Sequence, residues 1–174
     1  MSIGETLETE RLHLRRWTDD DIEDFHAIWG DPEVIWWGAN ESIEHTREML
    51  PKLVAQHATY PEGVGWYSVV SKATGRVVGD VLLQPAKFIE GIEIGWHFRR
   101  DAWGQGYATE AARRVADFAL QEAGVETLYA IVATENDRSL RIVEKLGMQR
   151  IKQMTYADLP HVLFSLESGA SPRG

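Results

Sequence analysis

Short runs in which hydrophobic and polar residues alternate predict the strands of a sheet. Leu12 and Leu14 give residues 8–16 this pattern. Two β-rich runs, at residues 66–71 and 77–83, are joined by a short turn that contains glycine, which is typical of a hairpin. Further strands are expected at residues 92–98, 128–133, 149–156 and 162–166. The apolar run at 128–133 is nearly unbroken, as in a central strand covered on both faces.

Apolar residues spaced three or four apart predict four helices. These are expected at residues 18–29, 42–54, 106–122 and 136–146. Pro51 lies in the second of them and predicts a kink or a break. A turn is expected at residues 158–160. The order of elements predicts one α/β or α+β domain with a mixed sheet over residues 1–168, followed by a disordered tail at 169–174.

Composition narrows the class of protein. The 174 residues are 44% hydrophobic and 26% charged, as is typical of one globular domain. No apolar run approaches the roughly 18 residues that span a bilayer, and no secretion signal is visible, so we expect no membrane partner and a cytoplasmic location. The absence of cysteine excludes disulfides, thiolate zinc sites and a cysteine nucleophile, and no metal is expected. The net charge of −9 argues against a nucleic-acid partner.

Small residues at alternate positions mark the most informative stretch of the chain. Gly104, Gly106 and Ala108 lie between the predicted strand at 92–98 and the predicted helix at 106–122. Such a turn leaves several backbone N–H groups unpaired at the positive end of a helix dipole, which favours an anion. Four arginines occur within residues 99–114, and this local basic patch suits a polyanionic ligand in an otherwise acidic protein.

A second motif lies downstream, with NDRS at residues 136–139 and EKLGM at 144–148. Together with WGQGYA at 103–108, TERLHLR at 9–15 and EIGW at 93–96, it resembles the GNAT superfamily of acyl-CoA-dependent N-acyltransferases. The similarity is to its RimJ/RimL-type branch, which contains ribosomal-protein alanine acetyltransferase-like enzymes. It implies a mixed, mostly antiparallel sheet with splayed strands, flanked by about four helices.

The resemblance implies acetyl-CoA as cofactor. The backbone amides of residues 104–109 would hold the diphosphate, and Arg99 or Arg100 could supply charge because Trp103 replaces the family's Arg or Gln. In the family, a strand bulge and a splay open a gap between the strands equivalent to 92–98 and 128–133. The pantetheine arm would lie in that gap. The cofactor-binding residues implied in this way are Trp96, His97, Phe98, Arg99, Gly104, Gln105, Gly106, Tyr107, Ala108, Thr109, Asn136 and Ser139.

Three residues are candidates for proton transfer. Glu93 is an acid in an apolar strand, in phase with His97, so either could accept the proton of an amine; both could equally be solvated surface residues. The family's tyrosine acid is replaced by Val143, and the RimL-like resemblance transfers that role to Ser139. Alternatively, Asn136 simply caps a helix and Ser139 is an ordinary first-turn residue.

The acceptor is expected to be an amine. Trp36 and Trp37 lie in an acidic segment that would suit a cation, although core packing or a dimer contact explains adjacent tryptophans as well. Together with Glu93, they are the candidate substrate-binding residues. The activity implied is direct acetyl transfer, in a ternary complex, to a protein N-terminus or a small amine, by a monomer or homodimer. A non-catalytic acyl-CoA-binding module is the alternative.

Overall fold

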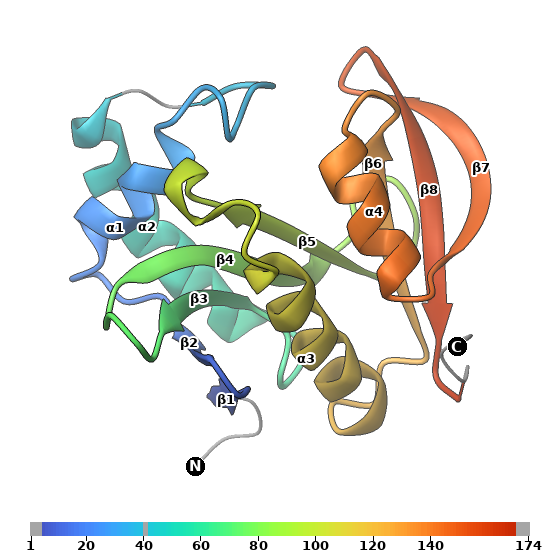
Figure 1. Cartoon of the computed structure of the whole chain (residues 1–174), viewed down its shortest axis with the longest axis horizontal. Helices are drawn as coiled ribbons and strands as arrows, with labels where there is room; N and C mark the ends of the chain where they lie inside the picture. The colour runs from blue at the N-terminus through green and yellow to red at the C-terminus, as the bar shows by residue number, and fades with distance from the viewer. Residues whose placement is uncertain (1–4, 40–41, 170–174) are drawn as a thin grey trace.

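The computed structural model describes residues 5–39 and 42–169, which form one eight-stranded sheet flanked by helices (Figure 1). The strands are β1 (Thr6–Glu8), β2 (Leu12–Arg16), β3 (Trp66–Ser71), β4 (Val77–Pro85), β5 (Ile92–Phe98), β6 (Thr127–Ala133), β7 (Gln149–Tyr156) and β8 (Leu159–Glu167). Their order in the sheet is β1-β2-β3-β4-β5-β6-β8-β7, and every pair is antiparallel except β5 and β6. The predicted mixed, mostly antiparallel sheet is confirmed.

Within residues 5–39 and 42–169, four α-helices accompany the sheet, as predicted. They are α1 (Ile22–Trp29), α2 (Ile43–Gln56), α3 (Tyr107–Gln121) and α4 (Asp137–Lys145). In Figure 1, α3 crosses the front of the sheet near β5, whereas α4 lies over β6 and β8. Alternation along β3 divides the core: Tyr67 and Val69 pack in the cluster that contains α3, and Trp66 and Val70 contact the cluster of α1 and α2.

The two central strands, β5 and β6, separate soon after they pair. Their ladder contains only the pairs Ile92 with Leu128 and Glu93 with Tyr129. By contrast, β6 pairs with β8 over its whole length, and β5 does so with β4. The edge of β5 beyond Glu93 therefore faces β6 without a partner in the ladder, as the predicted splay requires. The bulge implied for residues 92–98 is absent, because the β4–β5 register runs without a shift.

Several predicted boundaries are wrong in detail. Residues 8–16 contain parts of two strands, and α2 continues through Pro51, held by the fully buried Leu50. The last turn is formed by Ala157 and Asp158, both with positive φ, which suits a two-residue hairpin. Residues 159–160 therefore belong to β8. Of the predicted tail, residues 170–174 lie outside the described part of the chain.

Candidate functional site

A cleft of about 1120 Å³ opens where β5 and β6 diverge. Its walls come from β5, β6, the first turns of α3 and α4, the segment after α1 and the β7–β8 turn. Most of the residues predicted from the sequence line it: Trp36, Trp37, Glu93, Trp96, His97, Phe98, Gly104, Gly106, Tyr107, Ala108, Thr109, Asn136 and Ser139. Arg99 and Gln105 are not among the residues that line this cleft.

The glycine turn before α3 presents unpaired donors. Gly104 and Gly106 have φ of 76° and 79°, a conformation that glycine adopts without a steric cost. No side chain caps the helix at Gly106. In the described part of the chain, the N–H groups of residues 104–109 have no recorded acceptor, and the helix ladder starts with the bond from Glu110 N–H to the Gly106 carbonyl. The turn is therefore a cradle of main-chain donors at a helix N-terminus.

The cations at this end of the cleft come from α4. The Arg138 guanidinium stacks on the ring of Trp103, with Cζ 3.4 Å from the ring centroid. Lys145 and Arg141 line the same cleft. The tryptophan that replaces the family's Arg or Gln is therefore a platform for an arginine from another element.

The arginines predicted to supply this charge point elsewhere. Arg99 forms ion pairs with Asp24 and Asp101. Arg100 donates a hydrogen bond to Asp31, with Nε 2.7 Å from Oδ2, and forms an ion pair with Glu33 on the same loop. Carboxylates of the α1 region, together with Asp101, thus pair with these cations.

Ser139 connects α4 to β5 across the divergence. The indole N–H of Trp96 donates to Ser139 Oγ at 3.2 Å. The Asn136 side chain accepts from Ser139 N–H at 3.1 Å and caps α4. Since no acceptor is recorded within the described residues for the Ser139 hydroxyl proton, this O–H remains able to donate into the cleft. The capping role and a role for Ser139 in chemistry are therefore compatible.

Glu93 lies on the opposite face of β5 from Trp96, because successive side chains of a strand alternate. Its Oε2 accepts a hydrogen bond from Gln84 Nε2 at 3.0 Å. Burial raises the pKa of Glu93, and this hydrogen bond offsets part of that shift. A half-buried carboxylate with a raised pKa differs from the solvated surface glutamate that the sequence left open.

His97 lies on the same face as Glu93 and has a partner that sequence reasoning missed. Its Nδ1 is 2.9 Å from Oδ1 of Asp80, which is fully buried on β4 directly opposite. The other oxygen of Asp80 accepts from Trp29 Nε1 at 2.7 Å. Bound in this way, Asp80 favours a proton on Nδ1, so that Nε2 of His97 is the acceptor in the neutral ring. The available signal was an aspartate within the apolar run at residues 77–83.

Two tryptophans flank this face of the cleft. Trp36 and Trp37 are 45% and 48% exposed, so they are not core residues. The ring of Trp37 lies 5.6 Å from that of His97, and Glu33 lines the cleft beside them. The face therefore combines exposed aromatic surface with carboxylates, of which Glu33 is ion-paired with Arg100, and aromatic surface of this kind suits a cationic amine.

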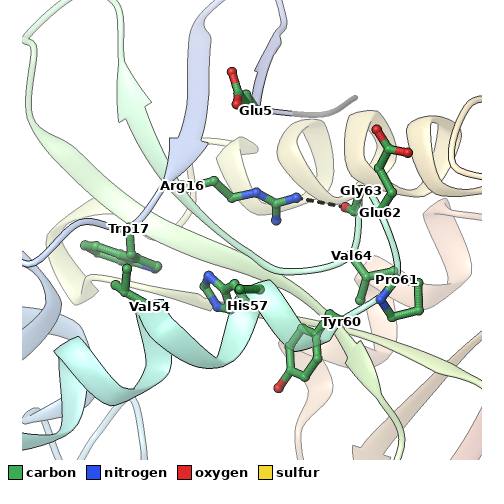
Figure 2. A pocket seen from close by; sticks show the side chains of 11 residues that line it. Glu5, Arg16, Trp17, Val54, His57, Tyr60, Pro61, Glu62, Gly63 and Val64 are labelled. Atoms are coloured by element: carbon green, nitrogen blue, oxygen red, sulfur yellow. Dashed lines mark hydrogen bonds between the residues drawn. The ribbon is translucent and has the colours of Figure 1, made fainter. Parts of the chain in front are cut away.

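A second cavity, of about 350 Å³, shares no residue with the cleft (Figure 2). Arg16 lies beside it and donates from Nη2 to the Gly63 carbonyl at 3.0 Å. Burial, with a contribution from the Arg16 charge, lowers the pKa of His57 to about 4, so this histidine is neutral. None of the residues predicted to bind substrate or cofactor lines this cavity.

Comparison with known proteins decides the family. The model of the acetyltransferase (GNAT) domain matches residues 11–149. The chain belongs to the GNAT acetyltransferase family. It is 30% identical to the uncharacterized protein YkkB of Bacillus subtilis, over 97% of this chain and 99% of the relative. It is 29% identical to the uncharacterized N-acetyltransferase YoaA of the same species, over 83% and 82%.

The fold also matches that of solved acetyltransferases. RimL, a ribosomal L7/L12 α-N-protein acetyltransferase in complex with coenzyme A, superimposes with a TM-score of 0.78 at 14% identity, covering 96% of this chain and 100% of that one. The RimJ/RimL-type branch is thus represented among the structural neighbours of this GNAT protein. Membership of the family makes it an N-acetyltransferase, which favours the enzyme over the non-catalytic module. None of the helices in the described ranges has the length and apolar character needed to cross a membrane.

GNAT acetyltransferases use acetyl-CoA, and the residues of the cleft fit such a cofactor. The cradle at 104–109 offers main-chain donors to a diphosphate, and α4 adds cations nearby. The unpaired edge of β5 offers backbone groups to an extended amide chain, as in β-strand addition. When bound, acetyl-CoA supplies an activated acyl group as a thioester.

Replacing Gly104 tests the cradle. Gly104→Ala forces an alanine into a left-handed conformation that costs about 1–2 kcal/mol. The turn is therefore expected to relax to another conformation, and ligand binding must then restore the strained one. We expect CoA affinity, measured by calorimetry, to fall about tenfold or more. Gly75→Ala is the matched control, since Gly75 has φ of 69° in the distant β3–β4 hairpin and equally open surroundings. Equal CoA affinities in the two variants would contradict this assignment.

Proposed function

We propose that this enzyme transfers an acetyl group from acetyl-CoA directly to the α-amine of a peptide N-terminus, with both substrates bound in one cleft. The observation that supports it most is the continuity of the cleft. The cradle at residues 104–109 and the face that carries Glu93 and His97 line one space on either side of the separated strand edge. The absence of cysteine removes one acyl-enzyme nucleophile, which favours direct transfer.

The shape and lining of the cleft favour a peptide over a small amine. On the acceptor side it extends from Trp36 and Trp37 to the β7–β8 turn at residues 156–161. A chain could therefore enter between these two walls with its amine beside Glu93. The fold neighbour RimL acts on a protein α-amine, which agrees with this choice.

The acceptor face carries two groups able to take the amine proton. Glu93 is the first, because burial raises its pKa towards the working range of a general base. His97, oriented by the buried Asp80, is the second. An α-amine titrates near 8, so modest basicity is enough to generate the neutral nucleophile.

Ser139 is suited to protonate the sulfur that leaves. Its hydroxyl oxygen accepts from Trp96, and this hydrogen bond orients the O–H towards other acceptors. Donation of that proton to the departing thiolate would complete the transfer. Val143 occupies the position of the family's tyrosine acid and cannot do so.

An acceptor panel read by thiol release tests the function. The panel contains a peptide with a free N-terminus, the same peptide blocked at its N-terminus but carrying lysine, and spermidine. We expect kcat/KM to be at least about tenfold higher for the free N-terminus, whose lower pKa leaves more neutral amine. Trp37→Ala should raise the acceptor KM and leave CoA affinity unchanged. A preference for spermidine would assign the cleft to small amines instead.

Glu93→Gln tests the base. This variant keeps the shape of the side chain and loses the proton acceptor, so kcat/KM should fall about 100-fold at neutral pH. In the wild type the ionised form is active and burial raises the pKa, so activity should decline as pH falls through that pKa. The variant should lack this decline. A larger loss in His97→Gln than in Glu93→Gln would transfer the role to the histidine held by Asp80.

Ser139→Ala tests the acid. We expect kcat at saturating acceptor to fall about 100-fold, the lower end of the range for a general acid, with CoA affinity nearly unchanged. Ser139→Thr keeps the hydroxyl and serves as control. Full turnover in the alanine variant would mean that solvent supplies the proton.

A further inference from the structure

Thr9 and Arg11, in the TERLHLR motif, have no part in the chemistry described so far, yet they contact the start of α3. Glu110, in the first turn of that helix, accepts a hydrogen bond from Thr9 Oγ1 at 2.6 Å and one from Arg11 N–H at 3.1 Å. Arg11 also donates from Nε to Glu110 Oε2 at 2.7 Å, and its Nη2 lies 2.7 Å from the same oxygen. The two segments are 99 residues apart at Arg11 and Glu110.

Arg11 reaches beyond the ion pair to the cradle itself. Its Nη1 donates to the Gln105 carbonyl at 2.8 Å, and its guanidinium lies 4.6 Å from the ring centroid of Tyr107. Arginine has donors in a rigid, planar fork, so one side chain can hold the carboxylate and the carbonyl in fixed relation. The residues of the cradle and the first turn of α3 are thereby tied to the chain before β2.

The bond to the Gln105 carbonyl determines where the next amide points. A trans peptide group is planar, so its C=O and N–H point in opposite directions. With the Gln105 oxygen held by Arg11, the Gly106 N–H points away from Arg11, and Gly106 lines the cleft. Glycine is conformationally permissive, so Gly104 and Gly106 alone do not prevent this peptide from turning over.

We propose that Arg11 is a positioning residue for the cofactor: it holds the Gln105–Gly106 peptide so that the Gly106 N–H faces the diphosphate of CoA. The inference rests on the diphosphate lying in the cradle at residues 104–109. Glu110 is the anchor of Arg11, because Oε2 of its carboxylate contacts both Nε and Nη2 of the guanidinium. Burial alone would raise the pKa of Glu110, but hydrogen bonds from Thr9 and Arg11 lower it and keep the anchor ionised.

The experiment compares Arg11→Met with Arg15→Met by calorimetric titration of CoA and of pantetheine, which lacks the diphosphate. Arg15 is a matched control: it lies in the same segment and binds Asp21 through two hydrogen bonds of 2.7 and 2.8 Å, away from the cleft. We expect Arg11→Met to weaken CoA binding about tenfold or more and to leave pantetheine binding unchanged. Arg15→Met should change neither affinity, even where its thermal stability falls. Equal CoA affinities in the two variants would overturn the proposal.

Glu110→Gln separates positioning from simple charge. It keeps the Arg11 cation and removes a negative charge near the anion site, so a purely electrostatic role predicts tighter CoA binding. A positioning role predicts weaker binding, since the arginine loses its anchor. Tighter binding would therefore reject positioning. A wild-type protein that binds CoA no better than pantetheine would instead refute the diphosphate site, and with it the proposed location of the cofactor.

Discussion

The early end of the β5–β6 ladder is the constraint on which the rest of this enzyme depends. Two parallel strands in the middle of a sheet normally exchange hydrogen bonds along their length. Here they share two residue pairs and then part. Backbone groups buried without partners are costly, so a separated strand edge is stable only where it is solvated or meets a ligand. The same feature that interrupts the sheet therefore makes a binding cleft.

The separation places different chemistry on the two faces of one strand. Alternation along β5 directs Trp96 towards α4, where it meets Ser139, and directs Glu93 and His97 to the opposite face. An acyl donor bound in the gap would therefore be accessible to side chains from both faces of the strand. The proposed base, Glu93, and Trp96, which binds the proposed acid Ser139 of α4, thus lie on opposite faces of one strand.

Contacts between distant elements compensate for the missing ladder. Helix α3 packs against β4, β5 and β6, so it covers both sides of the divergence. The Trp96–Ser139 hydrogen bond and the stacking of Arg138 on Trp103 link the half of the sheet that carries α4 to the half that carries the glycine turn. The site is therefore built between two halves that the core holds together, which suits the positional accuracy that acyl transfer demands.

The sequence by itself determined most of the elements and the glycine turn before α3. Periods of two and of three to four residues report local backbone geometry, and glycine at positions 104 and 106 reports a left-handed turn, so these features were predicted correctly. Only the tertiary structure decided which side chains meet. The β4–β5 register brings Asp80 opposite His97, Asp24 and Asp101 pair with Arg99, and Arg138 stacks on Trp103 beside the glycine turn. Strand register and long-range ion pairs depend on residues far apart in the chain, and local periodicity carries no information about them.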